Sequence, residues 1–136
     1  MREELRGPKV ENVAVAVAER LDENNNKVHY VYLINLRDDI MEGIIVTSKG
    51  YGMNVKTGEK VQTSMLRHCL EVLLPNEAAK LEPIMEDVFG LANEYWVSFY
   101  VDGKMYDKKF IFLPETILEN NMKDIPVLGM KGVMIK

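Results

Sequence analysis

The sequence predicts an all-β protein, an antiparallel β-sandwich of about seven strands with immunoglobulin-like architecture. The first observation is an alternation with a period of two, in which Val13, Val15 and Val17 alternate with alanines. Successive side chains of a strand point to opposite faces of its sheet. The second is Asp102-Gly103 between two alternating apolar runs, a pattern typical of a β-hairpin. The third is a succession of short apolar segments separated by turn residues.

The first half of the chain contains three predicted strands. Residues 13–18 form the first, with the valines directed inward and the alanines outward. After a polar turn at 22–26 comes a strand at 28–36, which is apolar on both faces, so we expect it to be covered on both sides. Residues 44–47 are rich in β-branched side chains and form the third strand. Residues 48–58 are rich in glycine, and we expect them to form a loop.

The middle of the chain is less regular. Strand character returns briefly at 60–62. Residues 65–74 fit either a helical face of leucines or an alternating strand, and we favour the strand, because the neighbouring segments are β and nothing caps a helix here. Residues 77–89 suggest a short strand or a single helical turn, since Pro83 would interrupt a longer helix.

The hairpin formed by residues 94–101 and 104–113 is the most regular element. Its first strand directs one set of side chains into the core: Tyr95, Val97, Phe99 and Val101. Trp96 and Tyr100 share the opposite face. That face is either an exposed aromatic patch, of the kind enriched at binding surfaces, or a second layer of core covered by a loop or by the C-terminal tail.

We expect one domain over residues 1–136, with a core at about 10–117 and an extended tail at 118–136. Short helical turns fit near 115–121. A length of 136 residues suits a single domain, and the content of 47% apolar and 28% charged residues is ordinary for a globular protein. A chain of this length buries roughly two-thirds of its unfolded surface, enough for a core without disulfides or metal.

Charge and cysteine content indicate the compartment and limit the partners. The net charge of −4 argues against a nucleic-acid partner, whose phosphates are bound mainly by lysine and arginine. Cys69 is the only cysteine, which favours a reducing compartment. The N-terminus lacks the apolar region of a secretory signal, and no apolar run approaches the roughly 20 residues that span a bilayer. We therefore expect a cytoplasmic protein with no membrane partner.

Few residues suggest chemistry. His29 and His68 are the only histidines, and neither they nor Cys69 have the spacing of zinc ligands, so we expect no metal and no cofactor. The acidic pairs Asp38-Asp39 and Glu86-Asp87 are interpreted as solvated turn charge, because the loop pattern of a calcium site is missing.

Phosphate binding and nucleophilic catalysis are also disfavoured. Residues 48–52, Ser-Lys-Gly-Tyr-Gly, do not follow the order of a phosphate-binding loop and are interpreted as a glycine-rich turn. If 65–74 is a strand, Cys69 and His68 point to opposite sides, so His68 cannot reach the thiol directly, whereas His29 could reach it in three dimensions. Cys69 is interpreted as a small, partly buried hydrophobe. With no catalytic residues identified, we lean against an enzyme.

Two functions remain open. The first is a non-catalytic protein-interaction or self-associating module, in which the apolar tail residues Val133, Met134 and Ile135 add a strand to the sheet edge of a neighbour or of their own chain. The alternative is a small-molecule-binding protein or enzyme with a site near loop 49–58. Its candidate binding residues are Lys49, Tyr51, Trp96 and Tyr100.

Several strings of the sequence resemble a family of short uncharacterised bacterial proteins over about residues 9–117. They are Val-Tyr-Leu-Ile-Asn-Leu at 31–36, Ser-Lys-Gly-Tyr-Gly at 48–52, and the stretches 82–91, 93–100 and 106–114. Some members carry the label phenylalanyl-tRNA synthetase α chain. The residues do not support that label, because a synthetase catalytic domain is much longer and needs basic and aromatic ATP-binding motifs. The resemblance therefore implies no catalytic residues.

Overall fold

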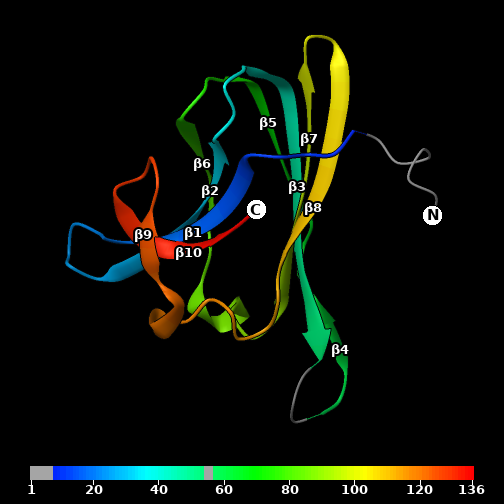
Figure 1. The fold of residues 1–136 in the computed structure, drawn as a ribbon. Helices are drawn as coiled ribbons and strands as arrows, with labels where there is room; N and C mark the ends of the chain where they lie inside the picture. Colours follow the sequence, from blue (N-terminus) through cyan, green and yellow to red (C-terminus); the bar gives the residue numbers. More distant parts are fainter. Residues whose placement is uncertain (1–7, 54–56) are drawn as a thin grey trace.

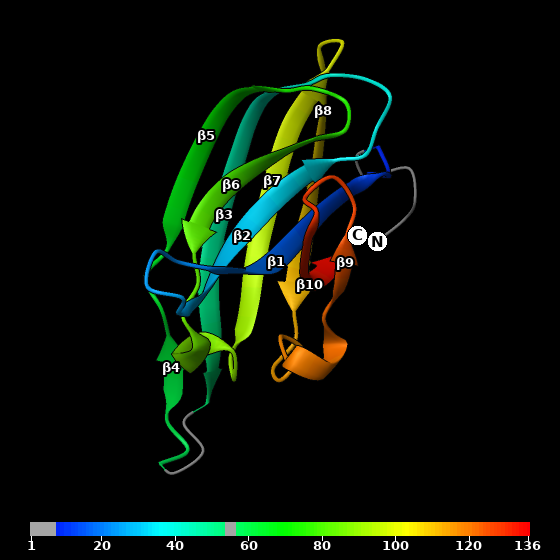
Figure 2. The same cartoon turned by 90° about the vertical axis from the view of Figure 1, so that its left-hand side faces the viewer.

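The computed structural model describes residues 8–53 and 57–136, which form two antiparallel β-sheets packed face to face (Figure 1). The strand order of the first sheet is β6-β2-β1-β10-β9, and that of the second is β4-β3-β7-β8, with β5 also paired to β3. Figure 2 shows the first sheet from its outer side, with the second behind it. The prediction of an all-β sandwich is confirmed, while the immunoglobulin-like assignment stays a prediction.

The element bounds of the first sheet are β1 Val13–Leu21, β2 Lys27–Asn35, β6 Glu77–Pro83, β9 Lys123–Ile125 and β10 Met130–Ile135. Those of the second are β3 Met41–Met53, β4 Lys60–Gln62, β5 Leu66–Leu73, β7 Ala92–Val101 and β8 Lys104–Phe112. Two short 3₁₀ turns complete the described chain, η2 at Glu86–Val88 and η3 at Glu119–Asn121.

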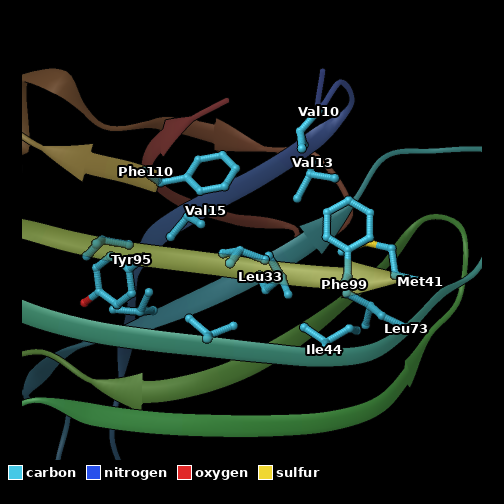
Figure 3. Packing of buried hydrophobic residues seen from close by; sticks show 14 of the residues in the cluster. Val10, Val13, Val15, Leu33, Met41, Ile44, Leu73, Tyr95, Phe99 and Phe110 are labelled. Atoms are coloured by element: carbon cyan, nitrogen blue, oxygen red, sulfur yellow. The ribbon is translucent and has the colours of Figure 1, made fainter. Parts of the chain in front are cut away.

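The main core fills the space between the sheets, and alternation along each strand selects its members. The valines of β1 and the odd-numbered residues of β7 point inward, as predicted (Figure 3). Phe99, Phe110 and Phe112 are its largest fully buried side chains. Such aromatics bury the most apolar area per residue, which makes the β7–β8 hairpin a major source of stability. Asp102 (φ 49°) and Gly103 (φ 76°) turn that hairpin in the left-handed conformation of a type I′ turn.

A second, smaller apolar cluster lies on the outer side of the first sheet, and we call this side the covered face. Its buried members are Ala14, Ala16, Ala18, Tyr32, Ile34 and Ile125. Leu128, Met130 and Met134 pack against them from the last two strands and their connection. Strand β2 is therefore covered on both sides, as its two apolar faces predicted.

The segment 65–74 is a strand, as favoured, and 77–83 is a strand followed by the turn η2. The expected glycine-rich turn at 48–52 is wrong, because β3 continues through these residues to Met53. The strand tolerates Gly50 and Gly52 because neighbours lie so close that side chains would collide. A Cβ on Gly52 would lie 2.9 Å from Leu91. Residues 54–56 of the predicted loop lie outside the described residues.

Residues 118–136, expected as an extended tail, contain β9 and β10, and Val133 belongs to the main core. Strand β10 inserts between β1 and β9. Gly132 permits this pairing, because a Cβ there would lie 2.2 Å from the carbonyl oxygen of Val17. The C-terminal strand is thus an integral part of the first sheet.

Candidate functional site

The outer side of the second sheet gathers the aromatic residues that the sequence singled out, and we call it the open face. Its exposed large side chains include Trp96, 46% exposed, and Tyr100, 43% exposed. Met105 of the adjacent strand is 50% exposed. Of the two alternatives left open for Trp96 and Tyr100, the structure therefore has the exposed patch. Exposed aromatic side chains at neighbouring positions are the usual composition of a binding surface.

The strand register arranges the centre of the open face in two rows across the sheet. One row, read from β5 to β8, is Arg67, Thr47, Trp96 and Lys109. The next row is Cys69, Ile45, Ser98 and Asp107. These rows enclose a shallow depression of about 280 Å³. The Nζ atom of Lys109 lies 4.6 Å from the centroid of the Trp96 ring, so a cation covers one part of the indole.

A further row flanks the centre on each side. On one side Glu42 pairs with Tyr100 and Tyr100 with Met105. On the other, Lys49 pairs with Glu94 and Glu94 with Ile111. On this face β3 carries Glu42 and Lys49 and β8 carries Asp107 and Lys109, so the open face has charges of both signs beside its aromatic side chains.

Lys49 and Tyr51 lie on β3, beside the open face rather than on a loop. The Nζ atom of Lys49 is 3.9 Å from Oε2 of Glu94 and 5.8 Å from the centroid of the Tyr51 ring. Both side chains are half-buried. The four predicted binding residues, Lys49, Tyr51, Trp96 and Tyr100, thus come from two adjacent strands of one sheet.

Val133, Met134 and Ile135 lie in β10 and pair with Val17, Ala16 and Val15 of the same chain. Their backbone groups already form a ladder with β1, and β9 lies on the other side of β10. In this structure the C-terminal strand therefore pairs with a sheet of its own chain. The other position considered for it was the sheet edge of a neighbouring molecule.

Each histidine meets a carboxylate. The Nε2 atom of His29, a buried residue, lies 3.3 Å from Oε2 of Glu19. The Nε2 atom of His68 lies 2.7 Å from Oε1 of Glu82, and the Ser48 hydroxyl donates to that same oxygen at 2.7 Å. A serine nucleophile needs histidine, not carboxylate, against its hydroxyl. In the cluster of Ser48, His68 and Glu82, the serine hydroxyl is bonded to the carboxylate and not to the histidine, so the cluster lacks the arrangement of a serine nucleophile.

The structure also shows the surroundings of Cys69 and of the acidic residue Asp39. Cys69 is exposed on β5, on the side opposite His68. Arg37 donates to Asp39 at 2.7 Å, and this bond lowers the pKa of Asp39.

Within residues 8–53 and 57–136, no group of three histidine, cysteine or acidic side chains is arranged to hold a metal ion. In the same part of the chain, no helix has the length and apolar character to span a membrane.

Comparison with protein-family models, with curated proteins and with solved structures gave no significant match.

Sequence reasoning identified the aromatic residues of the open face but missed Glu82, Ser48 and the charged rows. A signal for the rows was available, because β3 and β8 each place one acidic and one basic residue at outward positions once the strands are aligned. The alignment itself depends on which strands are neighbours, and sequence spacing did not supply that.

Proposed function

We propose that this protein is a non-catalytic module that associates with a second copy of itself through the open face. The observation that carries the proposal is the exposed group of Trp96, Tyr100 and Met105 at the centre of a sheet whose other side is the main core. Large aromatic side chains that are half-exposed in a monomer can be buried by a partner, and such residues dominate the energy of interfaces.

The pattern of charge favours a second copy as the partner. In an isologous pair, each residue of the face meets a residue of the same face related by a twofold axis. Consider an axis that lies in the interface, runs across the strands, and passes between the Trp96 row and the Ser98 row. This axis reverses the order of the rows and sets each strand over its own copy.

The resulting contacts are complementary. Lys109 of one copy faces Asp107 of the second copy, because these residues lie on β8 one row either side of the axis. Glu42 faces Lys49 of the second copy on β3, and Met105 faces Ile111 of the second copy on β8. These charged pairs are opposite in sign and this apolar pair is matched, while Trp96 faces Ser98 and Tyr100 faces Glu94 of the second copy. Two sheets pack in this aligned manner when their strands cross at about 30°.

The net charge opposes self-association at long range, whereas the charges of the open face favour contact. The chain carries a net charge of −4, so two copies repel each other at long range. The charges that face each other on the open face, Lys109 with Asp107 and Glu42 with Lys49, are opposite in sign, so contact there brings no local repulsion between them. We further propose a reducing, cytoplasmic setting, since the Cys69 thiol is free and exposed on this face.

Sedimentation equilibrium over a range of protein concentrations tests the proposal. The wild-type chain of 15.6 kDa is expected to approach twice that mass as concentration rises, whereas Trp96→Ala remains near 15.6 kDa. Leu21→Ala is the matched control, because Leu21 is 57% exposed but lies at the end of β1, away from the open face. A wild type that stays monomeric, or a Trp96→Ala variant that associates as the wild type does, would contradict the proposal.

A further inference from the structure

A pocket of about 240 Å³ opens where the end of β6 meets the middle of β3 and the start of β7, and we call it the Glu82 pocket. Its polar lining comes from Ser48, Lys49, Thr63, Ser64, Glu82, Asn93 and Tyr95. The ammonium group of Lys49 lies 3.9 Å from Oε2 of Glu94. The two sheets contribute to it jointly, since Glu82 belongs to the first sheet and Ser48 and Tyr95 to the second. The volume is below the range of about 300–1,000 Å³ usual for drug-sized ligands, so its occupant is a small molecule.

Tyr95 has an unfilled hydrogen-bonding capacity inside this pocket. The residue is 2% exposed, and its hydroxyl forms no hydrogen bond with any residue of the described ranges. In those ranges no fully buried side-chain polar atom lacks a partner, so the Tyr95 hydroxyl is open to the pocket that Tyr95 lines. Figure 3 shows its oxygen directed away from Leu33, Ile44 and Phe99. A phenol buried this deeply normally has a hydrogen-bonding partner.

The Glu82 carboxylate offers a second oxygen that can still accept a hydrogen bond in the pocket. Its Oε1 atom accepts hydrogen bonds from Ser48 and makes the contact with His68, both at 2.7 Å. The structure gives Oε2 no hydrogen bond with a described residue. Ser48 and His68 therefore fix the orientation of the carboxylate while its second oxygen can still accept a donor.

The side chain of Asn93 supplies a further acceptor. Asn93 uses its side-chain N–H groups on the backbone carbonyls of Val88, at 3.0 Å, and Leu91, at 3.1 Å. Its Oδ1 atom is left beside Gly50, 3.2 Å from where a Cβ on that glycine would lie. Burial, and after it the charge of Glu82, raises the pKa of Tyr95, so its hydroxyl stays protonated and keeps its oxygen lone pairs.

We infer that the Glu82 pocket binds a small organic amine. The ammonium group donates to Oε2 of Glu82 and to the oxygens of Tyr95 and Asn93. An apolar body then packs on the opposite wall, which Leu66, Ile84, Met85 and Val88 provide. An ammonium has three donors and no acceptor, which matches the oxygens of Glu82, Tyr95 and Asn93, since all three can accept a hydrogen bond. Lys49 of the flanking row also lines this pocket, but the three groups that would hold the ammonium, Glu82, Tyr95 and Asn93, take no part in the proposed self-association contacts.

Titration of ¹⁵N-labelled protein by NMR with three molecules of one shape tests the inference. The probes are benzylamine, benzyl alcohol and benzoate, which differ in the charge and donors of the head group. Benzylamine is expected to shift the backbone amide signals of Ser48, Thr63 and Ser64 and to bind about tenfold more tightly than benzyl alcohol, while benzoate gives no shift. Equal binding of amine and alcohol, preference for benzoate, or no binding at all would overturn it.

Two nearly isosteric variants separate the contributions. Glu82→Gln keeps an acceptor for Ser48 but removes the charge, and a loss of about tenfold in benzylamine affinity is expected. Tyr95→Phe removes only the hydroxyl, and a loss of about threefold to tenfold is expected. The controls are Glu71→Gln on the exposed side of β5 and Tyr32→Phe on the covered face, and both are expected to bind as the wild type does.

The same spectra report whether each variant is folded, so a loss of affinity is judged only on folded protein. Folded Glu82→Gln and Tyr95→Phe proteins that bind benzylamine as tightly as the wild type would also overturn the inference. Self-association is measured separately by sedimentation, and its failure would leave the amine titration unaffected.

Discussion

The covered face and the open face are outer sides of two sheets in one sandwich, yet they differ in almost every respect. The covered face is built on Ala14, Ala16 and Ala18, all 0% exposed, and later strands of the same chain seal it. The open face carries Trp96 and Tyr100, each more than two-fifths exposed. The central strand β1 carries small residues where the chain covers itself, whereas β7 carries large aromatic residues on a face that the chain leaves exposed. The difference indicates that the open face is available to a partner.

A buried charge is expected to separate the two faces most strongly. Ala16→Asp would place a carboxylate among Tyr32 and Ile34 without a partner, at a cost of about 4 kcal/mol in the free energy of unfolding. Ser98→Asp puts the same group on the open face of β7, where water reaches it, and is expected to cost about 1 kcal/mol or less. Urea unfolding at low protein concentration measures both. Equal losses would show that the two faces do not differ in cover.

The second prediction concerns the strand that seals the covered face. Gly132→Ala introduces a Cβ against the backbone of Val17, which cannot move aside easily, so a loss of about 3 kcal/mol is expected. Loosening β10 should also uncover the alanines of β1, detected as increased binding of the dye ANS. Lys131→Ala on the same strand is the control, because Lys131 is exposed. A Gly132→Ala protein as stable as this control would argue against the β1–β10 pairing.

Trp96 is expected to matter far less for stability than for association. Its side chain is half-exposed and its clearest contact is with Lys109, so Trp96→Ala should cost only about 1 kcal/mol of unfolding free energy. Trp96 is also the only tryptophan, so its fluorescence reports on the open face alone. Emission of the wild type should shift to shorter wavelength as concentration rises. An unchanged spectrum in a concentration range where the mass doubles would locate the contact elsewhere.

The smallest effect is expected at the end of the sandwich, away from both faces. Arg37 lies over the Tyr106 ring, at 5.3 Å, and lowers the pKa of Asp39 below the usual aspartate value of 3.8. The pair therefore contributes stability above that value, and the contribution is lost as the pH falls through the lowered pKa. Because the Asp39 side chain is 42% exposed and water screens the pair, Asp39→Asn should cost only about 0.5 kcal/mol at neutral pH. In acid the two proteins should become equally stable, and a difference that persists there would contradict this assignment.

Local patterns in the sequence predicted the parts of the fold that depend on local rules. The alternation over 13–18 predicted β1 and the direction of its valines, and Asp102-Gly103 predicted a hairpin with two left-handed residues. The expected turn at 48–52 was wrong because its glycines serve close packing rather than chain reversal. Strand β10 pairs with β1 across nearly the whole chain, and no local pattern indicates such a partner.

The candidate sites depend still more on distant contacts. The sequence identified Trp96 and Tyr100 as sharing one face of a strand, but their exposure depends on what covers that face. Glu82 and Ser48 meet only because β6 and β3 lie in opposite sheets that face each other. Tyr95 was assigned to the core from its alternation, which is correct for its ring. That its hydroxyl lacks a partner could be learned only from the three-dimensional arrangement.

Reversal of the paired charges on β8 is the most direct test of self-association through the open face. Asp107→Lys and Lys109→Asp each set like charges opposite one another about the proposed axis, and each is expected to keep the protein monomeric in sedimentation equilibrium. The double variant exchanges the two charges and recreates the opposed pairs, so it should associate as the wild type does. Association in both single variants, or a double variant that remains monomeric while the wild type associates, would contradict the account.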